Sequence, residues 1–166
     1  MSVEIYLKLD GIAGGSRNFA FKGCTDITSW GWELDSNRNT ADLSENDKTS
    51  CRQISVVKRI GMDSPDIMAH YMKGKIIPFA NLTAIPLVSK REARQKYLSI
   101  HMEDVLIKSI MTGGNATDEF FNETLVLLFS RVRTEVTINP VVGSDVATAV
   151  DYNFAWDIAH NRDWPQ

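Results

Sequence analysis

The chain has 166 residues, of which 43% are hydrophobic and 9% aromatic, a composition typical of one globular domain with a sizeable core. Its 18 lysine and arginine residues against 21 aspartate and glutamate residues leave a net charge of −3, which argues against a broad contact with nucleic acid or an anionic membrane. The chain has no run of 18 apolar residues and no apolar stretch of signal-peptide type near its start. We therefore expect no membrane insertion, and we expect any export to proceed without a signal peptide.

Alternation of apolar and polar residues dominates the first part of the chain. Residues 3–9 alternate in this way and predict a strand with one apolar face. A second strand is predicted over about residues 25–34, where Trp30 and Trp32 share one face and are expected to form a core layer. The opposite face of this strand carries Ser29, Gly31 and Glu33.

The seventeen residues from Asp35 to Cys51 contain only three hydrophobic side chains and follow no helical or strand period. We predict a long exposed loop over residues 35–51, and loops of this length in compact domains are usually functional or disordered. A second polar segment is a basic turn that carries Lys90, Arg91, Arg94 and Lys96.

One short helix is predicted, over about residues 64–73. Ser64 suits the N-cap, Pro65 suits the first helical position, and Gly74 can end the helix. The apolar stripe of this helix is expected on Ile67, Met68, Tyr71 and Met72.

Further extended segments follow over residues 52–60, 75–88, 97–111, 120–138 and 150–158. The acidic pair Glu103 and Asp104 interrupts the apolar alternation of its strand and predicts a bulge. In the last strand, the alternation places Phe154 and Trp156 in the core. About seven or more strands and one flanking helix predict a mainly β fold, an antiparallel barrel or two packed sheets, as a single domain over residues 1–166.

Residues that could carry chemistry are sparse. His70, His101 and His160 are isolated in the sequence, and the chain has neither a nucleophile motif nor a phosphate-binding glycine loop. Cys24 and Cys51 do not form a zinc-binding pattern and are expected to be free thiols. We therefore predict no catalytic residue, no metal and no cofactor, and we expect that the protein is not an enzyme.

Several segments, in chain order, resemble the Hcp family, the tube proteins of the bacterial type VI secretion system. They are Tyr6–Ile12, Ser29–Trp32, Lys58–Ile60 with Asp63–Pro65, Gly74–Pro78, Tyr97–Leu98 with Val105–Leu106, and Glu123 with Leu125 and Leu127. The resemblance covers most of the chain. Its most specific part is the Ser-Pro helix start followed by Gly-Lys-x-Ile-Pro.

The resemblance implies a β-barrel subunit of a homohexameric ring, with rings stacked into a hollow tube that carries effectors in its lumen. The implied partners are further copies of the chain, the spike protein, the sheath and effector proteins, without any cofactor. The tube would assemble in the bacterial cytoplasm and then be secreted. Ser29, Gly31 and Glu33 would face the lumen.

In such a ring, we expect the loop over residues 35–51 to govern the stacking of ring on ring. Its few hydrophobic side chains bury too little area to offset the cost of ordering the loop, so we expect its contact outside its own domain. Its polar composition predicts a salt-sensitive contact with the basic turn of a neighbouring subunit, through Lys90, Arg91, Arg94 and Lys96. The candidate contact residues of the loop are Asp35, Arg38, Asp42, Glu45, Asp47 and Lys48. Two other functions stay open, a monomeric β-barrel that binds a small ligand and a secreted effector of the same fold.

Overall fold

The computed structural model describes residues 2–36, 49–87, 97–138 and 150–165. Its elements along the chain are β1 (Val3–Leu9), a short 3-10 helix (Phe19–Phe21), β2 (Thr25–Ser36), β3 (Thr49–Arg59), α1 (Ser64–Met72), β4 (Ile77–Pro86), β5 (Leu98–Gly113), β6 (Asn122–Leu128), β7 (Arg131–Ile138), β8 (Val150–Asp157) and β9 (Arg162–Asp163). The predicted mainly β fold with one short helix is confirmed. None of the helices in these ranges is long and apolar enough to cross a membrane.

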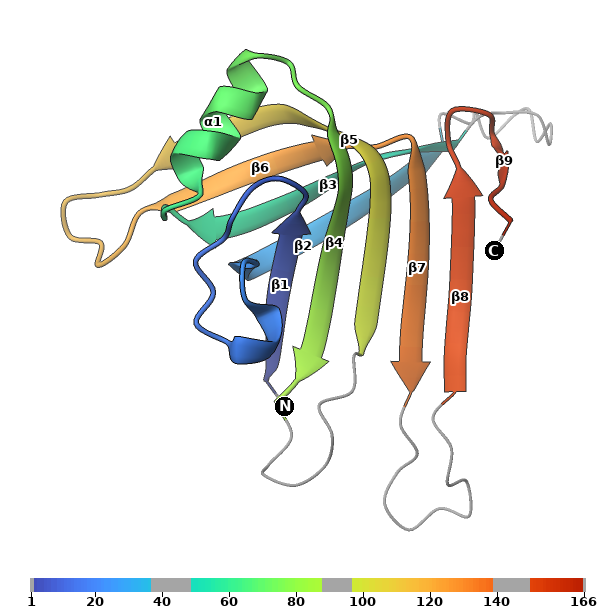
Figure 1. Ribbon diagram of the computed structural model, residues 1–166, viewed down its shortest axis with the longest axis horizontal. Coiled ribbons are helices and arrows are strands. Elements are labelled where there is room, and N and C mark those ends of the chain that lie inside the picture. The colour runs from blue at the N-terminus through green and yellow to red at the C-terminus, as the bar shows by residue number, and fades with distance from the viewer. Residues whose placement is uncertain (1, 37–48, 88–96, 139–149, 166) are drawn as a thin grey trace, which may run out of the picture.

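Six of the strands close into an antiparallel barrel. The order is β4-β1-β2-β3-β6-β5, and β4 also pairs with β5, which closes the circle. From β5 the sheet continues outward through β7, β8 and β9. In Figure 1, β1, β4, β7 and β8 stand upright in a front layer, and β2, β3 and β6 cross behind them at an angle. The barrel is therefore flattened into two packed layers.

Strand β5 belongs to both layers. Its residues 98–103 pair with β7 in the front layer, and its residues 106–113 pair with β6 in the back layer. At the corner between the two halves, Asp104 has a φ of +52°, a left-handed conformation. The bulge predicted at Glu103 and Asp104 is wrong in position, because the pairing with β4 keeps its register across Asp104 and the register shift of this strand lies between Ile107 and Ser109. What occurs at Asp104 is a change of pairing partner.

The single strand predicted over residues 120–138 is wrong, because this segment forms two strands, β6 and β7. At the junction, the backbone N–H of Ser130 donates to the carbonyl oxygen of Glu103 at 3.0 Å, and Phe129 turns into the core. β6 then pairs with β3 and the second half of β5, whereas β7 pairs with the first half of β5 and with β8. Residues 125–129 are all apolar, so the sequence does not reveal that the buried side chains change from Leu125, Leu127 and Phe129 to Val132 across the junction.

The core lies between the two layers. Ile54, Leu82, Met102 and Leu125 are fully buried there, and Trp30, Trp32 and Trp156 are half-buried against the same cluster. Phe154, which the alternation places in the core, is 46% exposed. Its strand, β8, lies beyond β5 and β7 in the front layer, and among the described residues no strand of the back layer pairs beside it.

Helix α1 agrees with the predicted range, but its contacts differ from those expected. Ile67 is fully buried, whereas Met68, Tyr71 and Met72 are 39%, 40% and 83% exposed. Asp63 occupies the N-cap position, and Ser64 is the first helical residue. The helix therefore packs on the barrel through a single apolar side chain, and the side chain of Ser64 is available for another role.

The side chain of Ser64 belongs to a buried polar cluster at the end of the back layer. The Lys58 ammonium, with 0% exposure, lies 2.8 Å from a carboxylate oxygen of Glu123 and 3.1 Å from one of Asp63. It also donates to Ser64 Oγ at 2.9 Å, and Ser64 Oγ donates to Glu123 Oε2 at 3.0 Å. Thr25 donates to the other oxygen of Asp63 at 2.6 Å. The cluster thus connects β2, β3 and β6 with the start of α1.

Candidate assembly surfaces

The back layer has two strand edges without a pairing partner among the described residues. β1 pairs with β2 only as far as Ile27, so β2 lacks a partner on that side over Ser29–Ser36. β4 and β7 pair with β5 only as far as Val105 and Glu103, so β5 lacks a second partner over Leu106–Gly113. Unpaired N–H and C=O groups along an edge are a template for pairing with another chain. These two edges lie on opposite sides of the four-stranded layer β2-β3-β6-β5.

The outer face of this layer carries three cross-strand rows of side chains, in which Glu33 is the one charged residue. Ser29 is opposite Val57, which is opposite Thr124, which in turn is opposite Met111. The second row is Gly31, Ser55, Val126 and Ser109, and the third is Glu33, Gln53, Leu128 and Leu106. A shallow groove of about 350 Å³ lies at Gly31, Glu33, Gln53 and Ser55.

Where the front layer extends past the barrel, one apolar face has no covering layer among the described residues. Three cross-strand pairs of β7 and β8 lie on the core side of the sheet, namely Ile138 with Val150, Val136 with Tyr152, and Thr134 with Phe154. Ile138 is 53% exposed, Val150 43% and Tyr152 59%. In Figure 1, the lower parts of β7 and β8 extend below the diagonal back layer. We name the face formed by these six residues the overhang.

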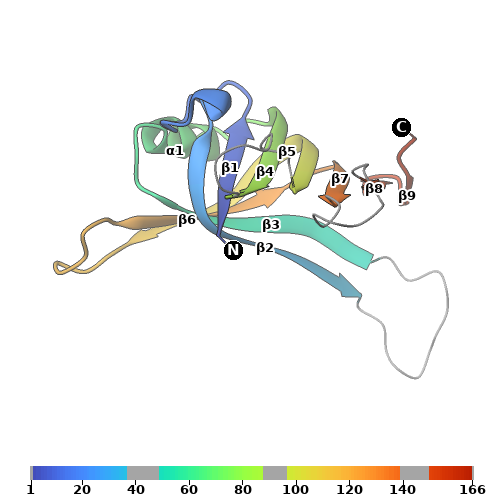
Figure 2. The same ribbon diagram turned by 90° about the horizontal axis from the view of Figure 1, so that it is seen from below.

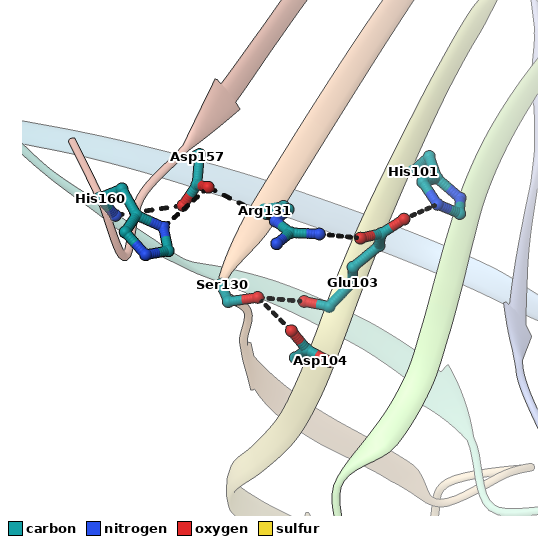
Figure 3. Close-up of polar contacts among 7 residues, drawn as sticks. All are labelled: His101, Glu103, Asp104, Ser130, Arg131, Asp157 and His160. Atoms are coloured by element: carbon teal, nitrogen blue, oxygen red, sulfur yellow. Dashed lines mark hydrogen bonds and ion pairs between the residues drawn. The ribbon is translucent and has the colours of Figure 1, made fainter. Parts of the chain in front are cut away.

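A chain of charged and polar side chains crosses the other face of the front layer (Figure 3). Arg131 lies between two carboxylates, with Nη1 3.1 Å from Glu103 and Nε 3.5 Å from Asp157. His101 lies 3.5 Å from Glu103, and His160 Nδ1 lies 2.9 Å from Asp157. Beside this chain of charges, Ser130 Oγ donates to Asp104 Oδ2 at 2.6 Å. No group of three or more potential metal ligands occurs within the described ranges. The chain of charges holds the turn after β8 against the sheet.

Asp157 is the centre of that turn. It is 3% exposed, and its Oδ1 accepts the backbone N–H of His160 at 3.1 Å. Burial alone would raise the pKa of this carboxyl, but the hydrogen bonds from His160 and the charge of Arg131 lower the pKa below its ordinary value. The ionised carboxylate is therefore the form that stabilises the fold.

Replacing Asp157 with asparagine is expected to lower the melting temperature at neutral pH. A depressed pKa contributes stability above the pKa of the unfolded chain, and this contribution is lost as the pH falls through the pKa of the folded protein. The gap between wild type and Asp157→Asn should therefore close as the pH is lowered below the ordinary range of aspartate. Thermal unfolding across an acidic pH series measures it, and a gap of constant size would contradict the assigned role of the charge.

The structure places the predicted residues as follows. Ser29, Gly31 and Glu33 are exposed on the outer face of the back layer, opposite the half-buried Trp30 and Trp32. The backbone of Asp35 belongs to β2. Arg38, Asp42, Glu45, Asp47 and Lys48 lie outside the described residues, as do the basic residues Lys90, Arg91, Arg94 and Lys96. The stacking contact between these two segments therefore stays a prediction.

Sequence reasoning missed most of the surface that surrounds Gly31. Ser55, Gln53 and Val126 lie beside it on neighbouring strands, yet they are far from it in the sequence. It also missed the two free edges, because an edge depends on which strands pair. The alternation in β3 and β6 does indicate an outward-facing set in each strand, but it does not indicate that the two sets are neighbours.

Comparison with known proteins agrees with this architecture. A family model described as "Type VI secretion system effector, Hcp" matches residues 6–136. The protein hcp1 of Pseudomonas aeruginosa is 24% identical over 163 residues, which cover 97% of this chain and 98% of that protein. The crystal structure of Hcp1 from Salmonella typhimurium has a TM-score of 0.76 and 24% identity over 99% of this chain and 100% of its own.

A further solved structure, described as a type six secretion system protein, has a TM-score of 0.85 at 15% identity and covers 98% of this chain and 100% of its own. At these identities the structures demonstrate the shared fold, and the family model demonstrates the relationship. The molecule is a secretion-system protein built on a flattened β-barrel. The chain belongs to the Hcp family of the type VI secretion system. This is a family of secreted tube proteins and not of enzymes.

Proposed function

We propose that this chain is the subunit of a homohexameric ring, and that such rings stack into the hollow inner tube of a type VI secretion system. The observation that carries the proposal is the pair of free edges on the back layer, each eight residues long, over Ser29–Ser36 and Leu106–Gly113. Two different edges on opposite sides of one sheet form a heterologous contact, and repetition of such a contact closes a ring.

Strand direction supports this pairing. Neighbouring strands in the order β2-β3-β6-β5 are antiparallel, so β5 runs opposite to β2. If β5 of one copy lies beside β2 of the next copy in a ring, the pair is antiparallel and extends the same sheet. The back layers of all copies would then form one continuous cylinder without open edges.

In the closed cylinder, the outer face of the back layer would face the bore of the ring. One face of each back layer is covered by the subunit's own front layer, so the other face lines the bore. Ser29, Gly31 and Glu33 would then be in the lumen, together with Gln53 and Ser55 on β3. A Cβ at Gly31 would meet Ser55 Oγ at 3.4 Å, an ordinary contact, so the backbone itself does not require glycine there.

The overhang supports the same assembly. Its apolar side chains face the core side of the sheet, and a neighbouring subunit would cover them in the ring. Exposed apolar area of this kind usually marks a protein contact.

The further partners in this proposal are the spike protein, the sheath and effectors carried in the lumen, and the tube would assemble in the bacterial cytoplasm before its secretion. The proposal assigns the chain no catalytic role and no cofactor.

A monomeric ligand-binding barrel has less support. The interior between the layers is filled by side chains such as Ile54, Leu82, Met102 and Leu125. The hollows at Gly31, at Met62 and at Tyr6 each include exposed residues in their lining, among them Glu33, Met62 and Val3.

Cross-linking between Thr28, which directly precedes the free edge of β2, and Met111 on the free edge of β5 tests the proposal. In a background with Cys24→Ser and Cys51→Ser, we expect that Thr28→Cys and Met111→Cys in the same chain give a ladder of covalent oligomers ending at six copies when treated with a short bismaleimide. Within one chain these positions are three strands apart, about 14 Å at the usual strand spacing, so the linkage forms between chains. Thr28→Cys with Tyr71→Cys on α1 is the matched control, expected to give no ladder. Equal, purely monomeric products from both pairs in the folded protein would overturn the proposal.

A further inference from the structure

A groove lies where the free edge of β2 begins. It has a volume of about 390 Å³ and is lined by residues 25–28 at the start of β2, residues 59–63 after β3, and Gly15. Two of its apolar side chains point outward, since Met62 is 69% exposed and Ile60 is 45% exposed. A Cβ added at Gly15 would lie 3.3 Å from the Met62 side chain, so Met62 covers this glycine closely. The groove thus has an apolar wall that the described part of the chain leaves open.

A protruding hairpin lies where the free edge of β5 ends. Figures 1 and 2 show the connection from β5 to β6 projecting away from the barrel. Met111, Phe120 and Phe121 at this hairpin are 69%, 48% and 50% exposed. A Cβ at Gly114 would lie only 2.2 Å from the Phe121 ring, so glycine at this position allows the ring to fold back across the hairpin. The guanidinium of Arg59 lies 4.1 Å from the centroid of the Phe120 ring. The base of the hairpin therefore carries an apolar surface, formed by Met111, Phe120 and Phe121.

The groove and the hairpin are at the same end of the back layer. The cross-strand row Ser29, Val57, Thr124 and Met111 runs from the beginning of the free edge of β2 to the end of the free edge of β5. In a ring, rotation about the axis keeps this end of every subunit at the same rim. Antiparallel pairing of β5 with β2 of the next subunit therefore brings the hairpin of one copy beside the groove of its neighbour.

We propose that the hairpin of each subunit packs into the groove of the next subunit and holds the two subunits together at one rim of the ring. We name this contact between hairpin and groove the clasp. The occupant of the groove is thus a second copy of this chain, through the side chains of Met111, Phe120 and Phe121. The inference rests on the proposed ring, and it adds a contact that strand pairing alone does not require. The clasp removes the exposed apolar surfaces of both elements from water in one step.

Two exposed methionines provide the test. Met62→Asp places a charge in the groove, whereas Met72→Asp places the same charge on α1, where Met72 is 83% exposed. In sedimentation velocity over a dilution series, rings of Met62→Asp should dissociate at a concentration about tenfold higher than rings of wild type or Met72→Asp, because a carboxylate opposes burial in an apolar contact. The melting temperature of the diluted monomers should be unchanged.

A charge-swap rescue makes the test specific. Met111→Lys alone should weaken the ring, and Met111→Lys combined with Met62→Asp should restore part of the loss, because the two charges would then face each other between subunits. If Met62→Asp and Met72→Asp rings dissociate at the same concentration, the clasp is wrong while the ring stands. If wild type forms no ring at any concentration, both the ring and the clasp are overturned.

Discussion

Replacing Lys58 with methionine is expected to lower the free energy of unfolding by about 3–5 kcal/mol. Lys58 and Glu123 are both 0% exposed, and the ammonium is the cation that both Glu123 and Asp63 contact. Methionine preserves much of the volume but leaves two buried carboxylates without a counter-charge. Removal of one member of a buried ionic group is costly because the remaining charge has lost both water and partner.

Denaturant unfolding at a fixed protein concentration measures this change. Lys108→Met is the matched control, because Lys108 is an exposed lysine whose ammonium donates to Gln53 at 3.1 Å. The control should change stability by no more than about 0.5 kcal/mol. An equally small effect of Lys58→Met would contradict the assignment of the buried cluster as a main stabilising element of this end of the barrel.

Replacing Tyr152 with aspartate is expected to abolish the ring while the subunit still folds. Tyr152 is 59% exposed on the overhang, so the single chain loses little buried area with the substitution. In the proposed ring a neighbour covers this face, and the aspartate would be buried there without a counter-charge. The contact recurs at every subunit interface, which multiplies the loss around the ring.

Sedimentation velocity and circular dichroism together measure this outcome. The matched control is Tyr71→Asp, since Tyr71 is a tyrosine on α1 that is 40% exposed outside the overhang. We expect Tyr152→Asp to sediment as a folded monomer and Tyr71→Asp to sediment as wild type. Intact rings of Tyr152→Asp would show that the overhang faces solvent in the assembly.

The faces of individual strands are predictable from the sequence. Alternation places Ser29, Gly31 and Glu33 opposite Trp30 and Trp32, and the structure has the same division. The helix and the mainly β class follow equally from local signals, because a period and a stop signal are properties of neighbouring residues.

Local patterns in the sequence do not indicate which distant segments pair with one another. Five consecutive apolar residues, 125–129, hide the shift in the buried positions from Phe129 to Val132, where the chain changes partners around Ser130. Phe154 has the pattern of a core residue, but no layer of the described chain covers it. Lys58, a charged residue in a strand, is buried only because Glu123 reaches it from β6 and Asp63 from the start of α1.

Four residues in the segments that resemble the Hcp family have a shared structural role. Lys58, Asp63 and Ser64 belong to segments that carry the resemblance, and Glu123 belongs to another such segment far along the chain. The structure brings all four into one buried cluster. Their role is thus to hold β3, β6 and α1 together at the end of the barrel where the groove and the hairpin lie.

Closure of this chain into a ring of identical subunits is tested most directly by sedimentation velocity of the unmodified protein at micromolar concentration. We predict a dominant species of about six times the subunit mass of 18.6 kDa, without addition of metal or cofactor. A single species of 18.6 kDa at both low and high salt would contradict the ring and the functions that depend on it.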